Sequence, residues 1–343
     1  MSEGPVHGGA PRGWLEFSAN LNPRGTPPQL DAVVRRAGYA AYADLDASGA
    51  ERHLADDAGV TPDRVLLVAG ATEAIRLIVT ALLGAGERTI ALGPTYGEYA
   101  RLARMRGADH RELRASPPAF EPCAGALVDE LRTAPYALAF ACDPNNPTGT
   151  LLPHDVLRRI VDALPAGTRL VVDQSFGAFA SSEISPSQLV REPNVILVRS
   201  LTKLLAAPGL RVGYVIAHPA LLSALRAVRD PWPVGAHACA AAACATWSLA
   251  EDARDETGRW RGDLADALRA LDLDVLVGQA PFLLVHVGPS ARRLVEGLAR
   301  ERIAVRWCAS FGLPEHVRIA VRPPLEQAAL LGALCRLHDE IRW

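Results

Sequence analysis

The stretch that decides the fold is residues 199–213, which read RSLTKLLAAPGLRVG and include Lys203. Lys203 is the only lysine of the chain, so the other 35 of its 36 basic residues are arginines. An arginine guanidinium stays protonated, whereas a lysine amine can lose its proton and attack a carbonyl group. A lysine retained by chance is the alternative, but the apolar run Val195–Val198 lies just before this one. We therefore interpret Lys203 as a nucleophile that follows a buried strand.

Polar side chains accompany Lys203 on both sides. A strand ending at Val198 would present Ser200 and Thr202 beside Lys203 at its carboxyl end, where open α/β sheets bind their ligands. Arg211 follows eight residues after Lys203, and an arginine binds phosphate through a planar fork of N–H groups. The hydroxyls and the guanidinium together predict a cradle for an anion.

A second anion site is indicated at residues 65–83. The apolar run 65–69 is followed by Gly70, Ala71 and Thr72 and then by a helical pattern to about residue 83. Free N–H groups and the helix dipole favour an anion at such a helix start. A plain turn in which Thr72 caps the helix is the alternative interpretation.

Three further candidates follow predicted strands. Asp173 ends the apolar run 169–173, and Asn146 lies in a proline-rich turn after the strand 136–141. Tyr96 follows the strand 89–92. Asp173 could simply cap the next element, and Tyr96 could pack in the core. A carboxylate and an aromatic ring at strand ends also suit the binding of a flat, charged ring.

These motifs, in this order, resemble the fold-type-I pyridoxal-phosphate (PLP) enzymes, the aspartate-aminotransferase superfamily, over nearly the whole chain. The resemblance implies that Lys203 bonds PLP covalently, Asp173 pairs with its ring nitrogen, Tyr96 stacks on the ring and Asn146 binds its phenolic oxygen. Its phosphate would be held by Gly70, Ala71, Thr72, Ser200, Thr202 and Arg211. Tyr42 of the partner subunit would also reach that phosphate, which implies a homodimer with shared active sites.

Within the superfamily, the chain resembles the branch of histidinol-phosphate aminotransferase and threonine-phosphate decarboxylase. The motifs 7–9, 17–23 and 305–308 are closer to the decarboxylase, which would imply cobalamin biosynthesis. We therefore expect a decarboxylase of an O-phosphorylated amino acid, with an aminotransferase as the alternative. A regulatory module without activity is disfavoured because Lys203 is present. The chain departs from the aminotransferase or decarboxylase patterns at Gln174, Ser175, Phe176, Pro233 and Gly235.

The same resemblance implies a set of substrate-binding residues, without saying which arginine takes which anion. Arg318 and Arg322 would also share a face of one strand by its period of two, although arginines on a solvated edge are the default. The residues expected to bind the carboxylate or phosphate of the substrate are His7, Asn20, Asn146, Arg306, Arg318 and Arg322.

Alternating strands and helices predict an α/β fold. We expect a large PLP domain with a mostly parallel central sheet and helices on both faces, plus a smaller α/β C-terminal domain. The expected boundaries are an arm at 1–40 that joins the small domain, a large domain at 41–230 and a small domain at 231–343.

Composition excludes several classes of function. The net charge is −2, so no basic surface indicates nucleic-acid binding. No apolar run is long enough to span a membrane, and the first residues lack the apolar core of a signal peptide, so we expect neither feature. The six cysteines lack the spacing of a metal site or a disulfide framework, and reduced thiols are typical of the cytoplasm. We expect a cytoplasmic enzyme without a metal.

Overall fold

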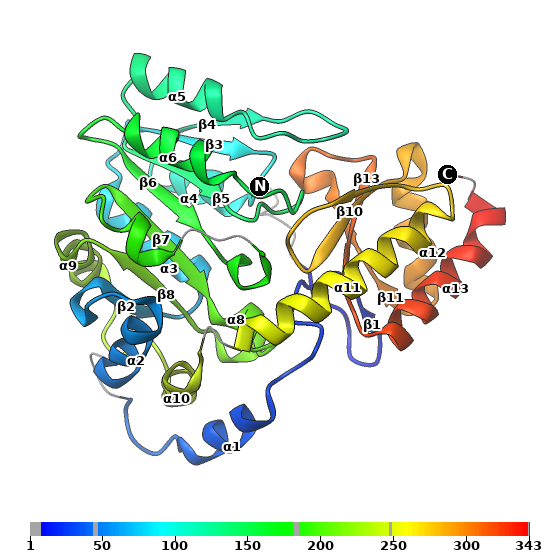
Figure 1. Ribbon diagram of the computed structural model, residues 1–343, viewed down its shortest axis with the longest axis horizontal. Coiled ribbons are helices and arrows are strands. Elements are labelled where there is room, and N and C mark those ends of the chain that lie inside the picture. The colour runs from blue at the N-terminus through cyan, green and yellow to red at the C-terminus, as the bar shows by residue number, and fades with distance from the viewer. Residues whose placement is uncertain (1–7, 44–46, 182–184, 247–248, 342) are drawn as a thin grey trace.

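A seven-stranded sheet forms the centre of the computed structural model, which describes residues 8–43, 47–181, 185–246, 249–341 and 343 (Figure 1). The strands follow the order β2-β8-β7-β6-β5-β3-β4. Their bounds are β2 Val65–Val68, β3 Arg88–Gly93, β4 Asp109–Arg114, β5 Leu138–Cys142, β6 Arg169–Asp173, β7 Val195–Ser200 and β8 Gly213–Ala217.

The sheet is mostly parallel, as predicted. Strands β4, β3, β5, β6 and β7 run parallel to one another, whereas β8 is antiparallel to both β2 and β7. Five parallel strands end at the same edge, so the residues that follow β5, β6 and β7 come together. The edge strand β4 carries charged side chains at alternating exposure and lacks the apolar run of the inner strands.

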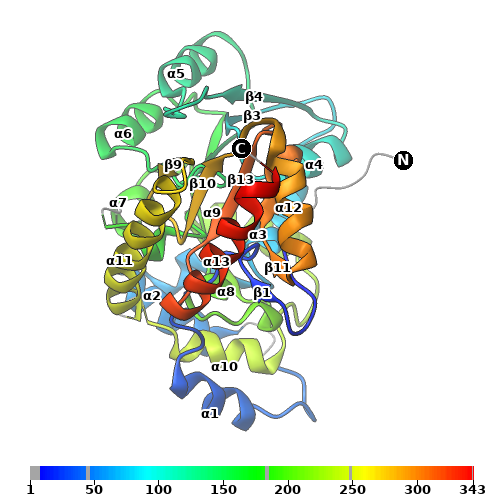
Figure 2. The same cartoon turned by 90° about the vertical axis from the view of Figure 1, so that its right-hand side faces the viewer.

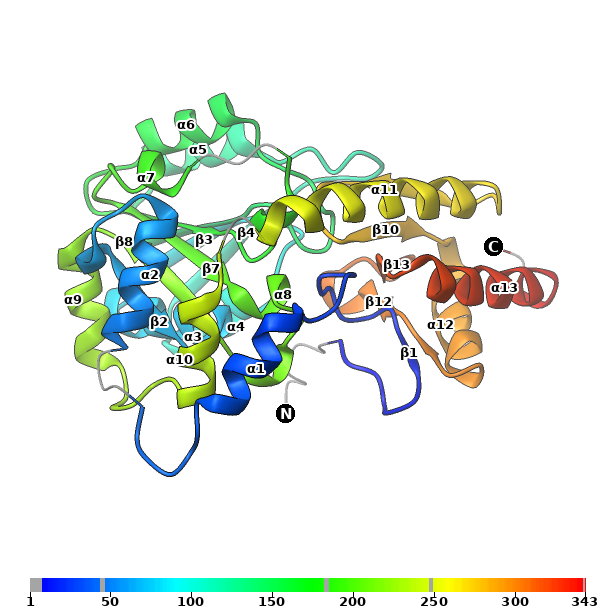
Figure 3. The same cartoon turned by 60° about the horizontal axis from the view of Figure 1, so that its bottom comes forward.

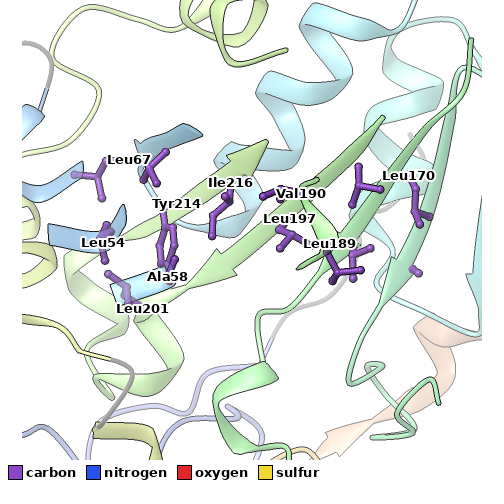
Figure 4. Packing of buried hydrophobic residues seen from close by; sticks show 14 of the residues in the cluster. Leu54, Ala58, Leu67, Leu170, Leu189, Val190, Leu197, Leu201, Tyr214 and Ile216 are labelled. Atoms are coloured by element: carbon purple, nitrogen blue, oxygen red, sulfur yellow. The ribbon is translucent and has the colours of Figure 1, made fainter. Parts of the chain in front are cut away.

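Helices cover both faces of this sheet, which explains why its inner strands are apolar throughout. Leu67, Leu197, Tyr214 and Ile216 face one side, where α2, α5, α6 and α10 pack (Figure 4). Their neighbours along the strands face α3, α4 and α9 on the other side. The helices are α1 Pro28–Arg36, α2 Ser48–Ala58, α3 Ala71–Leu82, α4 Glu98–Met105, α5 Ala124–Thr133, α6 His154–Asp162, α7 Pro186–Leu189, α8 Leu201–Leu204, α9 Pro219–Val228 and α10 Ala236–Cys244.

A second sheet, of four antiparallel strands, lies beside the first in the order β12-β13-β10-β9. Helices α11, α12 and α13 cover one face of it (Figure 2). Its other face carries Arg318, which alternates with the buried Val317 and Ile319. The bounds are β9 Asp274–Val277, β10 Phe282–His286, β12 Arg306–Trp307, β13 His316–Ala320, α11 Leu249–Arg269, α12 Ala291–Arg300 and α13 Pro324–Ile341.

The N-terminal arm lies against this smaller unit. Strand β1, Leu15–Glu16, pairs in parallel with β11, Ile303–Ala304. Phe17 is buried among side chains of α11, α12 and α13, and its carbonyl accepts from the N–H of Ala320. From there the chain runs to α1, beside α10 (Figure 3).

Helix α10 bears on the domain boundary expected at residue 231. Ala238 and Ala241 of α10 are buried with Leu54 of α2 in the core of the large sheet. We therefore propose that the small domain begins at α11 rather than at residue 231.

Within the described ranges, no helix combines the length and the apolar character that crossing a membrane would require.

Candidate active site

A cavity of about 190 Å³ lies between the carboxyl ends of the large sheet's strands and the small sheet. Segments from the arm, the large sheet and strands β12 and β13 all contribute to it. The predicted residues that line it are Asn20, Ala71, Thr72, Tyr96, Asn146, Asp173, Ser200, Thr202, Lys203, Arg211, Arg306 and Arg318. The structure thus gathers side chains that are up to 298 positions apart, from Asn20 to Arg318.

The start of α3 forms one end of the cavity. Gly70 precedes this helix with a φ of 90°, in a region that side chains rarely adopt. A Cβ there would lie 2.9 Å from Nη2 of Arg211, so the absence of a side chain lets the guanidinium reach the helix start. The first N–H groups of an α-helix have no intrahelical partner. The helix start and Arg211 therefore make a site for an anion.

The hydroxyls near this end differ in their contacts. Tyr96 Oη lies 3.1 Å from Thr72 Oγ1, and burial raises the pKa of Tyr96 to about 12. The Thr202 hydroxyl donates to the Val212 carbonyl at 3.1 Å. Thr202 therefore fixes the loop before β8, and its donor is already engaged. Ser200, at the end of β7, also lines the cavity.

Asp173, at the end of β6, is buried and held by three donors. Its Oδ1 accepts from the N–H and the hydroxyl of Ser175 at 2.9 and 2.6 Å, and its Oδ2 accepts from the Tyr99 hydroxyl at 2.7 Å. Burial raises the pKa of Asp173, while these hydrogen bonds act in the opposite direction. The arrangement gives a fixed carboxylate that faces the cavity.

Lys203 lies on the short helix α8 after β7, and its amine is largely enclosed. Burial, together with the positive charges of Arg318 and Arg211, lowers the pKa of Lys203 to about 8 against the opposing charge of Asp173. A buried lysine of this kind carries a much larger neutral fraction near pH 7 than an exposed one. The amine is therefore suited to act as a nucleophile and as a base.

Two arginines of the small sheet face Lys203 from the opposite side. Arg306 and Arg318 are direct partners in the antiparallel pair β12–β13, so both side chains project from the same face. Arg318 donates from Nη1 to Asn146 Oδ1 and from Nη2 to the Ser18 carbonyl at 2.9 Å. Arg306 donates to the Ser310 hydroxyl at 2.5 Å. Burial lowers the pKa of Arg318 to about 10, so it stays charged at neutral pH.

Three predicted residues of the described ranges, Gly70, Tyr42 and Arg322, are not in this lining. Arg322 lies beyond the end of β13, where it forms an ion pair with Glu326 at 2.9 Å. Tyr42 is 79% exposed and stacks on Trp232, with ring centroids 4.4 Å apart. His7 lies outside the described residues.

Other lining residues were given no role in the site from the sequence, although Phe176 is one of the positions that depart from the family patterns. Ser310 and Phe311 come from the turn after β12, and Phe176 comes from the turn after β6. Tyr99 lies behind the cavity, where burial raises its pKa and keeps it a donor to Asp173. Its position three residues after Tyr96, at the second residue of α4, was the available signal.

The donor set fits the cofactor that the resemblance implies. A phosphate would take the helix start and Arg211, a protonated ring nitrogen would take Asp173, and the carbonyl would lie at Lys203. Arg318 Nε and Asn20 Oδ1 are buried without a hydrogen-bond partner among the described groups. Buried polar atoms of this kind are expected to meet a ligand or water.

Comparison with known proteins identifies the family. The model for class I and II aminotransferases matches residues 12–337. A histidinol-phosphate aminotransferase of Symbiobacterium thermophilum is 30% identical over 93% of this chain and 89% of that protein.

Solved structures show the same fold. A histidinol-phosphate aminotransferase of Sinorhizobium meliloti, in complex with pyridoxal-5′-phosphate, has a TM-score of 0.87 at 22% identity over 94% of this chain and 90% of that one. L-threonine-O-3-phosphate decarboxylase of Porphyromonas gingivalis has a TM-score of 0.81 at 26% identity, over 94% and 99%. The chain therefore belongs to the class I and II aminotransferases and is a PLP-dependent enzyme.

Proposed function

We propose that the chain is an aminotransferase of the histidinol-phosphate type, which acts on a small primary amine that carries an anion. The observation that carries this proposal is the arginine pair Arg306 and Arg318, which lies across the cavity from Lys203. Like charges directly opposite each other on neighbouring strands repel, so an anion between them is stabilised by both. Relatives of about 30% identity that are named histidinol-phosphate aminotransferase support the same choice.

This proposal puts the aminotransferase before the decarboxylase that we expected from the motifs. Two relatives that are 30% and 29% identical to the chain are histidinol-phosphate aminotransferases. The decarboxylase is a neighbour in structure. Short motifs around the substrate favoured the decarboxylase, but over a comparable length the aminotransferase is the more similar, at 30% identity against 26%.

PLP, when bound, supplies an electrophilic carbonyl for the substrate amine and a ring that draws electrons from the bonds at the amine-bearing carbon. Asp173, fixed by Ser175 and Tyr99, would hold the proton on the ring nitrogen. The Lys203 amine would take the proton from the amine-bearing carbon of the substrate, and would return it to the cofactor side. Its pKa of about 8 suits a base that works near neutral pH.

Arg318 would set the orientation of the substrate. Asn146 and the Ser18 carbonyl hold two of its nitrogens, so the guanidinium offers the N–H of its third nitrogen, Nε, in a fixed direction. A fixed anion places one bond of the reacting carbon in the direction where it breaks most easily, and so decides between loss of a proton and loss of a carboxylate.

The experiment that tests this proposal compares two reactions of one purified preparation. With L-histidinol phosphate and 2-oxoglutarate, we expect glutamate to form and no carbon dioxide to be released. With O-phospho-L-threonine, we expect no carbon dioxide. Release of carbon dioxide from phosphothreonine, without glutamate formation from histidinol phosphate, would overturn the proposal.

The decarboxylase remains a second candidate because of Phe176. This residue lines the cavity and packs edge-on against Phe282, with ring centroids 5.3 Å apart. The resemblance to the superfamily implies a tyrosine at this position in many aminotransferases, and Phe176 cannot supply its hydroxyl. The decarboxylase of known structure, 26% identical, supports this candidate as well.

We also propose a homodimer in which Tyr42 of the partner subunit reaches the phosphate end of the cavity. An exposed tyrosine stacked on the half-exposed Trp232 is an aromatic surface of the kind that interfaces bury. Sedimentation of the holoenzyme should give twice the mass of one chain.

The cytoplasmic location and a role in cobalamin biosynthesis stay predictions from the sequence.

A further inference from the structure

The carboxylate of Glu16 organises a turn of the N-terminal arm. Its Oε1 accepts from the Ser18 N–H at 2.6 Å, from the Ser18 hydroxyl at 2.6 Å and from the Ala19 N–H at 3.0 Å. Its Oε2 accepts from the Ala10 N–H. One half-buried side chain therefore ties residue 10 to residues 18 and 19 through charge-assisted hydrogen bonds.

The segment that Glu16 ties together is a wall of the cavity. Gly8, Ser18, Ala19 and Asn20 all line it. The two sides of this wall are in close contact, since a Cβ on Gly8 would lie 2.3 Å from the Ser18 carbonyl oxygen. The Ser18 hydroxyl, which donates to Glu16, also accepts from the Gly9 N–H at 2.9 Å.

The same turn holds the substrate-facing arginine. The Ser18 carbonyl accepts from Nη2 of Arg318 at 2.9 Å, so the position of the turn sets the position of one guanidinium nitrogen. Glu16 itself pairs with Ala304 in the β1–β11 ladder, two residues before Arg306. The carboxylate therefore acts on Arg318 through Ser18, while the backbone of Glu16 holds the arm beside β11, just before Arg306. Its negative charge also offsets part of the cost of burying Arg318.

We propose that Glu16 is a positioning residue for the substrate, which holds the wall of residues 8–20 so that Ser18 fixes Arg318 for the anion of the incoming amine. Glu16 does not line the cavity and acts through Ser18 and Arg318. The inference rests on the proposed function, because it assigns the arginine to an anionic amine. It adds to that function a residue that no motif of the family predicted here.

The test uses the holoenzyme of Glu16→Gln and Glu16→Ala. Either change removes a charged acceptor of several backbone N–H groups, so the turn loses its fixed position. We expect KM for histidinol phosphate and for 2-oxoglutarate to rise about tenfold, from the typical strength of charge-assisted hydrogen bonds. We expect kcat to stay within about twofold, because Lys203 and Asp173 lie on the other wall. The visible band of the bound cofactor should be unchanged.

The matched control is Glu87→Gln. Glu87 also accepts a backbone N–H, from Gly84 at 2.5 Å, but in an exposed turn outside the cavity lining. It should leave KM, kcat and the visible band at their wild-type values. An equal rise in KM in the control would overturn the inference, because it would mark a general loss of rigidity.

Direct binding separates this inference from the proposed function. Glutarate has the two carboxylates of 2-oxoglutarate but cannot react, and its binding is followed by the visible band of the cofactor. If wild type lacks aminotransferase activity but Glu16→Gln still weakens glutarate about tenfold, the proposed function fails and the role of Glu16 stands. Unchanged glutarate binding in both variants, loss of the cofactor band, or failure of both variants to fold would overturn the role of Glu16.

Discussion

The two walls of the cavity are built in different ways. The large-domain wall is made by residues at the strand ends of one sheet and in the loops and helix starts beside them, namely Ala71, Asn146, Asp173, Lys203 and Arg211. The small-domain wall, made by Ser18, Asn20, Arg306 and Arg318, joins the arm to strands of a separate sheet.

The two walls differ in how far apart in the sequence their interacting residues lie. The contact between Ser18 and Arg318 spans 300 positions of sequence, so it exists only through tertiary packing. On the large-domain wall, the parallel sheet alone brings its strand ends together. We therefore propose that the large-domain wall activates the bonds of the substrate, and that the small-domain wall selects and orients the substrate. Substitutions on the two walls should accordingly have different kinetic effects.

The largest effect is expected for Lys203→Arg, on the large-domain wall. An arginine keeps the charge and most of the length, but its guanidinium cannot serve as a nucleophile or base at neutral pH. Activity with histidinol phosphate should fall at least about 1,000-fold. Borohydride reduction of the wild-type holoenzyme should label Lys203 alone, by mass spectrometry of its peptides. Retained activity in the variant would refute a covalent role for this amine.

The next effect belongs to the small-domain wall and comes from Arg318→Gln. Removing a buried charge that meets the substrate anion should raise KM about 100-fold, whereas the visible band of the cofactor stays in place. Arg322→Gln is the matched control on the same segment, because Arg322 pairs with Glu326 outside the cavity. Its ion pair is partly exposed, so KM should change less than about twofold. Steady-state kinetics of both variants measure the contrast.

Arg318 and Arg322 also show where prediction from the sequence stops. The period of two placed both on one face of a strand, but β13 ends at Ala320, before the prolines at 323 and 324. The alternation therefore does not extend to Arg322. Strand β4 was missed for a related reason, because an exposed edge strand needs no apolar run.

The large-domain wall was far easier to predict. Asp173 and Lys203 each follow an apolar run that the structure shows as a buried strand, β6 and β7, and the mostly parallel sheet is confirmed. Contacts behind the wall were not predicted. Tyr99 reaches Asp173 across 74 positions, and Glu16 acts on backbone groups, which leave no trace in a side-chain motif.

A smaller effect is expected for Tyr99→Phe, which deletes one donor to Asp173 and leaves the packing on Phe140 intact. Loss of a hydrogen bond to a buried carboxylate should lower kcat about tenfold. KM should hardly change, because Tyr99 lies behind the large-domain wall, where it contacts Asp173, Tyr96 and Phe140. The pH dependence of the visible band should shift as well, since Asp173 is less well held as an anion. A change in KM alone would contradict this assignment.

The smallest effect is a shift in pH dependence that links the two walls. Burial, with the charges of Arg318 and Arg211, lowers the pKa of Lys203 from 10.5 to about 8. The reactive form is the neutral amine, so reactivity rises with pH, and at pH 7 about a tenth of the amine is neutral rather than less than about a thousandth. Labelling of cofactor-free protein by acetic anhydride, read at the Lys203 peptide, should therefore have a midpoint near pH 8.

Arg318→Gln removes one of the positive charges that disfavour the protonated amine. The labelling midpoint should then move to higher pH, because the remaining lowering comes from burial and Arg211. Arg322→Gln should leave the midpoint in place, since Arg322 lies outside the cavity. An unchanged midpoint in Arg318→Gln would mean that the small-domain wall does not act on Lys203 through charge. A shift would show that the wall that selects the substrate also tunes the amine that reacts with it.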